Sequence, residues 1–174
     1  MSRICQGDIL RDTKFHLVDP SEKVLQILYP YVVVLSQDCD LEQYNPDKAQ
    51  ESGPIPDNQF MPYVLLAPCF LDEVVRSGNH LVAAFNIKQD RLNSERWNYV
   101  KQNRDQRYHY LKGQPDMQVP DLVLDFKHYL TSPFDAFRKV YKDSYLASVS
   151  ELFREDLSLR FCSYLSRVGL PVLP

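Results

Sequence analysis

The densest group of chemically active side chains in this chain is a run of five polar or reactive residues. It supplies a hydroxyl, an amide, a thiol and two carboxylates, the groups that nucleophilic, acid–base and metal sites use. The run directly follows residues 31–35 (YVVVL), a continuous apolar stretch typical of a strand that is buried on both faces. Because a rigid strand holds the residues at its end in place, we predict a functional site there. Its candidate residues are Ser36, Gln37, Asp38, Cys39 and Asp40.

Cys39 leaves three interpretations open. A thiol becomes a nucleophile beside a cation or base that favours the thiolate, whereas its two sequence neighbours are acidic. A catalytic Cys39 therefore needs His109 or an arginine to fold over it. A metal or polar binding site is the second interpretation, although no closely spaced ligand pair of the kind zinc sites use is present. The third is simple packing at the strand end, with Asp40 capping the next turn.

His109 lies between two tyrosines, in a segment with the alternation of a strand. On a strand it faces away from Tyr108 and Tyr110, which share the opposite face. His109 is a candidate general base or a structural histidine. The tyrosines either form a platform on which nucleic-acid bases stack or pack in the core.

Residues 88–107 form the most basic segment of the chain, and we predict a polar surface helix over residues 91–104. Its charged face is either solvated or a phosphate-binding surface. For nucleic acid, we expect phosphate contacts from Arg104, Arg107 and Arg160. Asp125 stands inside an apolar strand, so it must face solvent or pair with an arginine such as Arg107 or Arg138.

Composition limits the function classes. The 174 residues suit a single domain. The net charge is −3, so the overall charge of the chain does not support nucleic-acid binding. The four cysteines have no metal-binding spacing, and we expect neither a metal nor another cofactor. No apolar run approaches the roughly 18 residues of a membrane span, and residues 1–5 are not an apolar signal segment. We therefore expect a reduced, cytoplasmic protein without membrane contact.

The pattern of short strands predicts an α+β fold that is mainly β. Close strand spacing favours a partly closed, SH3-like antiparallel barrel over residues 1–147, with a polar middle helix. Residues 42–62 read as a long polar loop, either a lid or partner-binding loop or a disordered insertion. An amphipathic helix is predicted over residues 149–168, beginning with a capping box of Ser148 and Glu151.

Two segments resemble the small barrel of the MazF/PemK toxin family. Gly7-Asp8-Ile9 is similar to the start of that family, and residues 30–36 (PYVVVLS) are similar to its Arg-Pro-Val-Val-Val-Val-Ser strand. The resemblance implies metal-independent RNA cleavage by an arginine before the proline and a hydroxyl at the strand end. Ser36 matches the hydroxyl, but Tyr29 stands at the arginine position, so the expected electrophile and acid is missing. Residues 36–41 also resemble a Ser-x-x-Cys-Asp-Leu pattern of uncharacterised bacterial and phage proteins, which implies no activity.

Three function classes follow. The first is a toxin-like protein that binds or cleaves RNA. The second is a non-catalytic interaction module of a bacterial or phage system, which binds a protein partner or a second copy through aromatic and arginine surfaces. The third is a metal- or thiol-dependent site at Cys39. The sequence has no Gly-rich phosphate loop, GxSxG motif or HExxH motif.

Overall fold

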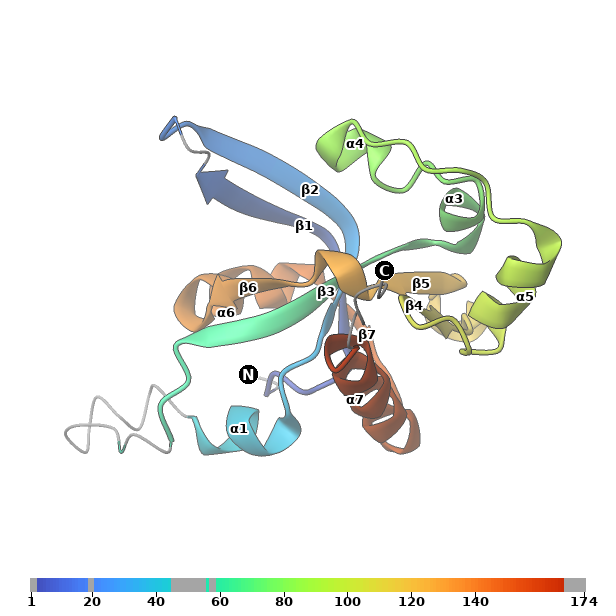
Figure 1. The fold of residues 1–174 in the computed structure, drawn as a ribbon. Coiled ribbons are helices and arrows are strands. Elements are labelled where there is room, and N and C mark those ends of the chain that lie inside the picture. Colours follow the sequence, from blue (N-terminus) through green and yellow to red (C-terminus); the bar gives the residue numbers. More distant parts are fainter. Residues whose placement is uncertain (1–2, 19–20, 45–55, 57–58, 168–174) are drawn as a thin grey trace, which may run out of the picture.

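The structure is a computed structural model, and residues 3–18, 21–44, 56 and 59–167 are described. Within these ranges it is an α+β protein with a seven-stranded antiparallel sheet, which confirms the expected class (Figure 1). The strands are β1 (Asp8–Val18), β2 (Val24–Val34), β3 (Tyr63–Leu71), β4 (Tyr108–Leu111), β5 (Leu122–Asp125), β6 (Leu130–Pro133) and β7 (Tyr145–Ser148). The helices are α1 (Asp38–Gln43), α3 (Asp72–Arg76), α4 (Val82–Phe85), α5 (Ser94–Lys101), α6 (Phe134–Ser144) and α7 (Glu151–Leu165).

The sheet has the strand order β4-β5-β3-β2-β1-β7, and β6 pairs with β3 as well. The long β1–β2 hairpin, with Ile9 opposite Val33 and Val18 opposite Val24, projects beyond the other strands (Figure 1). β4 and β7 are at the two ends of the strand order, so the sheet is open. The sequence had instead favoured a partly closed barrel. A cavity lies between these two strands, as described below.

Two hydrophobic clusters cover the two faces of the sheet. Alternation along residues 32–35 sends Val32 and Val34 to one cluster and Val33 and Leu35 to the other, as the apolar run predicts. The first cluster also contains residues of α3, α5 and α6, and the second contains residues of α7. The end of β2 is therefore held from both sides, which makes it a rigid support for the residues that follow.

The C-terminal third differs from the prediction in one element. The apolar pairs and triplets at residues 140–141 and 145–147 suggest the last strand from sequence, but residues 140 and 141 belong to helix α6, and β7 begins only at Tyr145. The helix forms because Phe134, Phe137 and Tyr141 recur at helical spacing, and all three are buried on the sheet. This part of the strand prediction was wrong.

The last helix forms close to where it was predicted. It begins at Glu151, after Ser150, while Ser148 belongs to β7, so the predicted capping box is absent. Most of the predicted loop over residues 42–62, namely 45–55 and 57–58, lies outside the described residues. No helix in the described ranges has the length and apolar character needed to cross a membrane.

Candidate functional site

Ser36 is part of the framework that joins β2 to β3. Its hydroxyl oxygen accepts a hydrogen bond from the Leu65 N–H at 2.8 Å, and its own N–H donates to the Leu65 carbonyl at 3.3 Å. The residue is buried. The Ser36 hydroxyl therefore fastens the end of one strand to its neighbour.

Asp38 is an anchor between distant parts of the chain. Its Oδ1 accepts from the Gln6 N–H at 2.7 Å, and its Oδ2 accepts from Nη1 of Arg154 at 2.9 Å. These bonds tie the N-terminal segment and α7 to the first turn of α1. The neighbouring Gln37, Cys39 and Asp40 are exposed at the start of this short helix. The five predicted residues thus do not converge on one point.

A metal site at Cys39 would need further ligands, such as the thiol of Cys69 and a histidine. Cys39 is exposed on α1, whereas Cys69 is buried in β3, where burial raises the pKa of its thiol. The part of the chain that the structure describes contains no group of three or more His, Cys, Asp and Glu residues placed to hold a metal ion. All four cysteines are free thiols.

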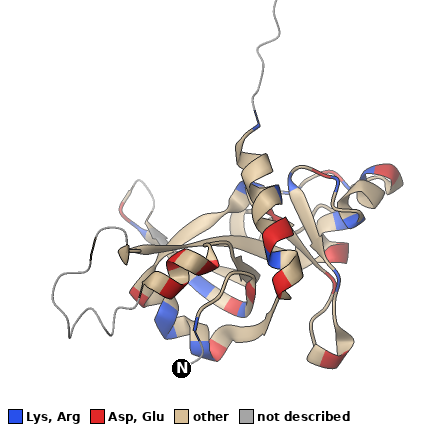
Figure 2. Ribbon diagram, turned by 90° about the horizontal axis from the view of Figure 1, so that it is seen from below, with Lys and Arg blue, Asp and Glu red and all other residues tan. Residues whose placement is uncertain are grey.

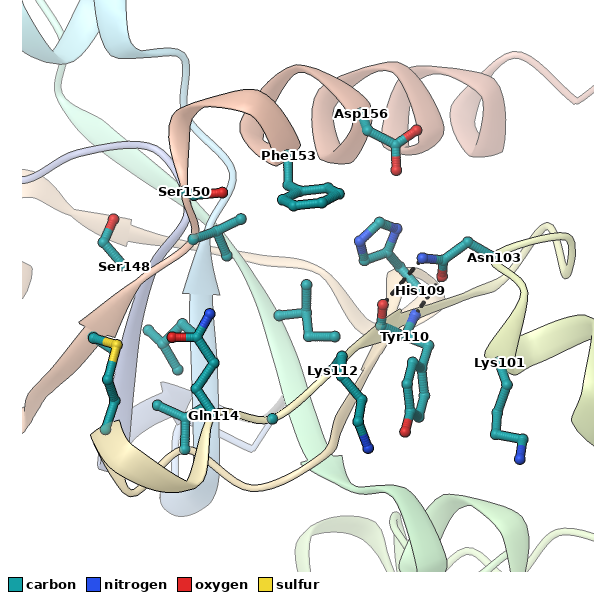
Figure 3. A pocket seen from close by; sticks show the side chains of 17 residues that line it. Lys101, Asn103, His109, Tyr110, Lys112, Gln114, Ser148, Ser150, Phe153 and Asp156 are labelled. Atoms are coloured by element: carbon teal, nitrogen blue, oxygen red, sulfur yellow. Dashed lines mark hydrogen bonds between the residues drawn. The ribbon is translucent and has the colours of Figure 1, made fainter.

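A cavity of about 470 Å³ lies between β4 and β7, beneath the first turns of α7 (Figure 3). This volume is within the range of roughly 300–1,000 Å³ that small-molecule sites occupy. Its walls are mostly apolar and come from β1, β4, β7 and the segment around residue 119. The apolar wall residues are Ile9, Leu111, Met117, Val119, Ala147 and Val149, and Phe153 of α7 lies over the opening.

His109 is the most buried polar side chain of this cavity, with 2 % of its surface exposed. Its ring points toward α7, below Phe153 and Asp156 (Figure 3). Nε of Arg160 donates to its Nδ1 at 2.9 Å, so the ring hydrogen must be on Nε2. Burial, together with the Arg160 charge, lowers the pKa of His109 to about 3. At neutral pH, His109 is therefore an uncharged hydrogen-bond donor rather than an effective general base.

Arg160 clamps α7 onto the segment that precedes β4. Beyond His109, its guanidinium donates to the carbonyl of Asn103, to that of Asp105 at 2.7 Å and to that of Tyr108 at 3.0 Å. Arg160 therefore uses its Nε and both Nη atoms in hydrogen bonds within the fold. The predicted phosphate contact of Arg160 would compete with these bonds.

The outer edge of β4 is covered by side chains. The Asn103 amide donates to the Tyr110 carbonyl at 3.0 Å, and the Tyr110 N–H donates to Asn103 Oδ1 at 2.6 Å. Asn103 has a φ of 56°, in the left-handed region that asparagine tolerates well. Together with the Arg160 bond to Tyr108, these contacts satisfy the strand edge as a further strand would. This explains why β4 does not continue the sheet toward β7.

Tyr108 and Tyr110 pack against other residues of the protein, which was the alternative to a platform for stacking bases. Tyr108 is buried and donates its hydroxyl hydrogen to Gln89 Oε1 at 3.0 Å, and burial raises its pKa to about 12. Tyr110 donates to Asp121 Oδ2 at 2.5 Å, and its ring meets Trp97 edge-on. His109 contacts Phe126 on the other side of the strand, so the predicted alternation is confirmed.

A second depression, of about 360 Å³, is lined by four arginines. Its lining residues are Arg96, Tyr99, Arg104, Asp105, Gln106, Arg107 and Arg167. We call this feature the arginine depression. Elsewhere basic and acidic residues are interspersed along the ribbon (Figure 2), in keeping with the net charge of −3. Arg104 is exposed, and its guanidinium has no hydrogen-bond or ion-pair partner among the described residues.

Arg107 is held at the arginine depression by a buried carboxylate. Its Nε and Nη2 donate to the two oxygens of Asp125 at 2.7 and 2.5 Å, and His80 Nε2 lies 3.3 Å from the same carboxylate. Burial raises the pKa of Asp125, but the hydrogen bonds from Arg107 and His80 lower it by more. The expected Asp125–Arg107 ion pair is confirmed. Nη1 of Arg107 has no hydrogen-bond partner in the described ranges.

The predicted site residues thus lie in separate parts of the structure. Residues 36–40 follow β2, Tyr108 is in the core, and Arg160 joins α7 to the segment before β4. His109 and Tyr110 line the cavity, and Arg104 and Arg107 line the arginine depression. Sequence reasoning missed Phe153 and Asp156 of α7, which reach the cavity only through tertiary packing. No model of a known protein family matches the chain, and no curated protein matches it either.

Proposed function

We propose that the protein binds single-stranded RNA and does not cleave it. The observation that supports this most directly is the arginine depression, where Arg104 is unpaired within the described part and Arg107 keeps one free nitrogen. Arginine side chains that meet phosphates release counterions, which is the main source of affinity in nucleic-acid binding. The exposed ring of Tyr99 adds an aromatic surface beside them.

A single strand fits this surface better than a duplex. The arginine depression and the cavity are neighbours along the chain, because Asn103 lines the cavity and Arg104 lines the depression. A concave apolar site beside cations suits an unstacked base with its phosphates outside, and proteins recognise single-stranded RNA in this way. In a duplex, the bases are paired and stacked, so none is available to enter a cavity.

Binding without cleavage is proposed because the two groups that the toxin-like mechanism needs are not in place. Tyr29, at the position of the expected arginine, is buried beside Phe15 and Phe70. Burial, with a smaller contribution from Asp125, raises the pKa of Tyr29 to about 12. The Ser36 hydroxyl is engaged with Leu65. Neither group is positioned to exchange protons with an RNA backbone.

The test is the salt dependence of RNA binding. We expect a short single-stranded oligoribonucleotide to bind in fluorescence anisotropy, more weakly as salt rises from about 50 to about 200 mM, without cleavage products. Arg104→Gln should reduce the logarithmic salt slope by about 0.7, the contribution of one phosphate contact to single-strand binding. Arg11→Gln, an exposed arginine on β1, is the matched control and should leave the slope unchanged. No binding at low salt would overturn the proposal.

A second candidate, a protein-interaction module, is favoured by the outer surface of α7. Leu152 and Leu159 are 80 % and 70 % exposed and lie two helical turns apart. Two leucines on one helix face suit a contact with another helix, such as α7 of a second copy. Sedimentation analysis tests this: a dimer that Leu159→Glu dissociates would favour it, and a monomer at all concentrations would exclude self-association.

A further inference from the structure

We propose that the cavity between β4 and β7 binds one unstacked guanine base of the RNA, an inference that rests on the proposed RNA binding. His109 Nε2–H would donate to the guanine O6, and the Asp156 carboxylate would accept from N1–H and from the N2 amino group. Phe153 would stack on the ring. The cavity would thus add base selectivity to a surface whose arginines contact only phosphates.

The first step is the unsatisfied donor in the cavity. Arg160 fixes Nδ1 of His109 as an acceptor, so Nε2 carries the hydrogen. Nε2 has no hydrogen-bond partner among the described residues, although the side chain is almost wholly buried. A polar donor on the wall of a mostly apolar cavity normally has an acceptor there, from a ligand or from water. A carbonyl oxygen on a flat ring satisfies this donor and fits the apolar walls.

The second step is the acceptor that lies opposite. The Asp156 carboxylate extends from α7 toward the His109 ring (Figure 3). It forms no hydrogen bond or ion pair within the described ranges, and it is on the cavity lining. Guanine is the base whose Watson–Crick edge has two adjacent donors next to a carbonyl acceptor. Adenine and cytosine present an acceptor at the ring nitrogen of that edge, and uracil has a single N–H between two carbonyls.

The third step concerns the shape of the site. The apolar walls and the ring of Phe153, which is 59 % exposed over the opening, provide surfaces for a planar base. Lys101 also lines the cavity, where its ammonium can meet the adjoining phosphates, whereas the Lys112 ammonium is paired with Asp121 at 2.8 Å. Because Asn103 and Arg104 are consecutive, a strand with one base in the cavity can continue into the arginine depression.

An extended peptide is a poorer occupant of the same cavity. A peptide that adds to a sheet needs free N–H and C=O groups along a strand edge. On β4 these groups are bonded to Asn103 and Arg160. The site therefore offers side-chain hydrogen bonds and a stacking surface, which suit a base.

The experiment compares oligouridylates that differ at one central nucleotide: guanosine, inosine, adenosine or uridine. Inosine differs from guanosine only by the missing 2-amino group. We expect the full-length protein to bind the guanosine oligomer about tenfold more tightly than the inosine oligomer, within the range of a bidentate base contact. Asp156→Asn should remove this preference. Glu155→Gln, an adjacent exposed carboxylate outside the cavity lining, removes the same charge and should keep it.

The possible results separate the two proposals. Equal, salt-dependent binding of all four oligomers overturns the guanine site and leaves RNA binding standing. A preference for another base, or a guanosine preference that survives Asp156→Asn, also overturns it. If no oligomer binds, RNA binding fails, and free guanosine is then tested by ligand-observed NMR. If free guanosine binds and Asp156→Asn abolishes this binding, the cavity is retained as a guanine site. If free guanosine does not bind, the guanine site is rejected together with RNA binding.

Discussion

Replacement of Asp125 by asparagine tests the buried ion pair that holds Arg107. Asp125 is fully buried and joined to Arg107 by two hydrogen bonds, while the Arg107 side chain is only 18 % exposed. Breaking such a pair leaves an uncompensated charge and costs about 3–5 kcal/mol. With an m value of about 2 kcal/mol/M, a loss of about 4 kcal/mol lowers the urea midpoint by about 2 M.

The assay is urea unfolding followed by the fluorescence of Trp97, which is buried against Tyr110. Asp143→Asn, an exposed carboxylate on α6, is the control and should change the free energy of unfolding by no more than about 0.5 kcal/mol. In the double variant Arg107→Met with Asp125→Leu, neither charge of the pair remains. It should be more stable than Asp125→Asn alone.

The pH dependence gives an independent check on the same pair. The pKa of Asp125 is lower in the folded protein than the ordinary aspartate value, so the unfolded chain binds its proton first as pH falls. The stabilisation from ionised Asp125 is therefore complete above the unfolded pKa and is lost as pH falls through the folded pKa. The difference between the wild type and Asp125→Asn should shrink in acid. A constant difference, or a loss below about 1 kcal/mol at neutral pH, would refute this account of the pair.

Three further predictions concern the cavity and the end of β2. The His109 ring resonances should show no protonation in NMR from neutral pH to about pH 4, because the pKa of His109 in the folded protein is about 3, and titration near pH 6 would contradict the neutral ring. Because a histidine in the unfolded chain has a pKa of about 6.5, the free energy of unfolding should fall as pH drops from about 6.5 to about 3. Arg160→Met should cost about 3 kcal/mol in urea unfolding, because it removes a charged donor from buried carbonyls, and a cost near zero would show that the clamp is unimportant. Cys39→Ala should change the free energy of unfolding by no more than about 0.5 kcal/mol and leave RNA binding intact, because the thiol is exposed; loss of binding would restore Cys39 as a site residue.

The sheet was predictable where burial imposes a simple sequence pattern. The apolar run at residues 31–35 indicated a strand covered on both faces, and the structure places its side chains alternately in two clusters. Helix α6 was missed because Val140 and Tyr141 have high strand propensity. The helical spacing of Phe134, Phe137 and Tyr141 was the stronger signal, since tertiary burial of one helix face outweighs local propensity.

The site was only partly predictable, because its geometry depends on contacts between distant residues. The position of His109 on a separate face from its tyrosine neighbours followed from strand alternation. The role of Asp38 did not, since its partner Arg154 is 116 residues away. Asp156 likewise had no sequence signal, because only the packing of α7 brings it to the cavity. Polar residues at a strand end can serve to join segments, and here Ser36 and Asp38 do so.

The Arg160 clamp makes the two concave features mechanically dependent. A single guanidinium connects α7, which carries Asp156, to the backbone of residues 103–108, which carries Arg104 and Arg107. We therefore expect a ligand that shifts α7 to move the arginines, and phosphates that fix the arginines to restrict α7. Such coupling is reciprocal in binding free energy. A longer RNA would occupy both the cavity and the arginine depression. Its binding free energy should then differ from the sum of the free energies measured for the base alone and for the phosphates alone.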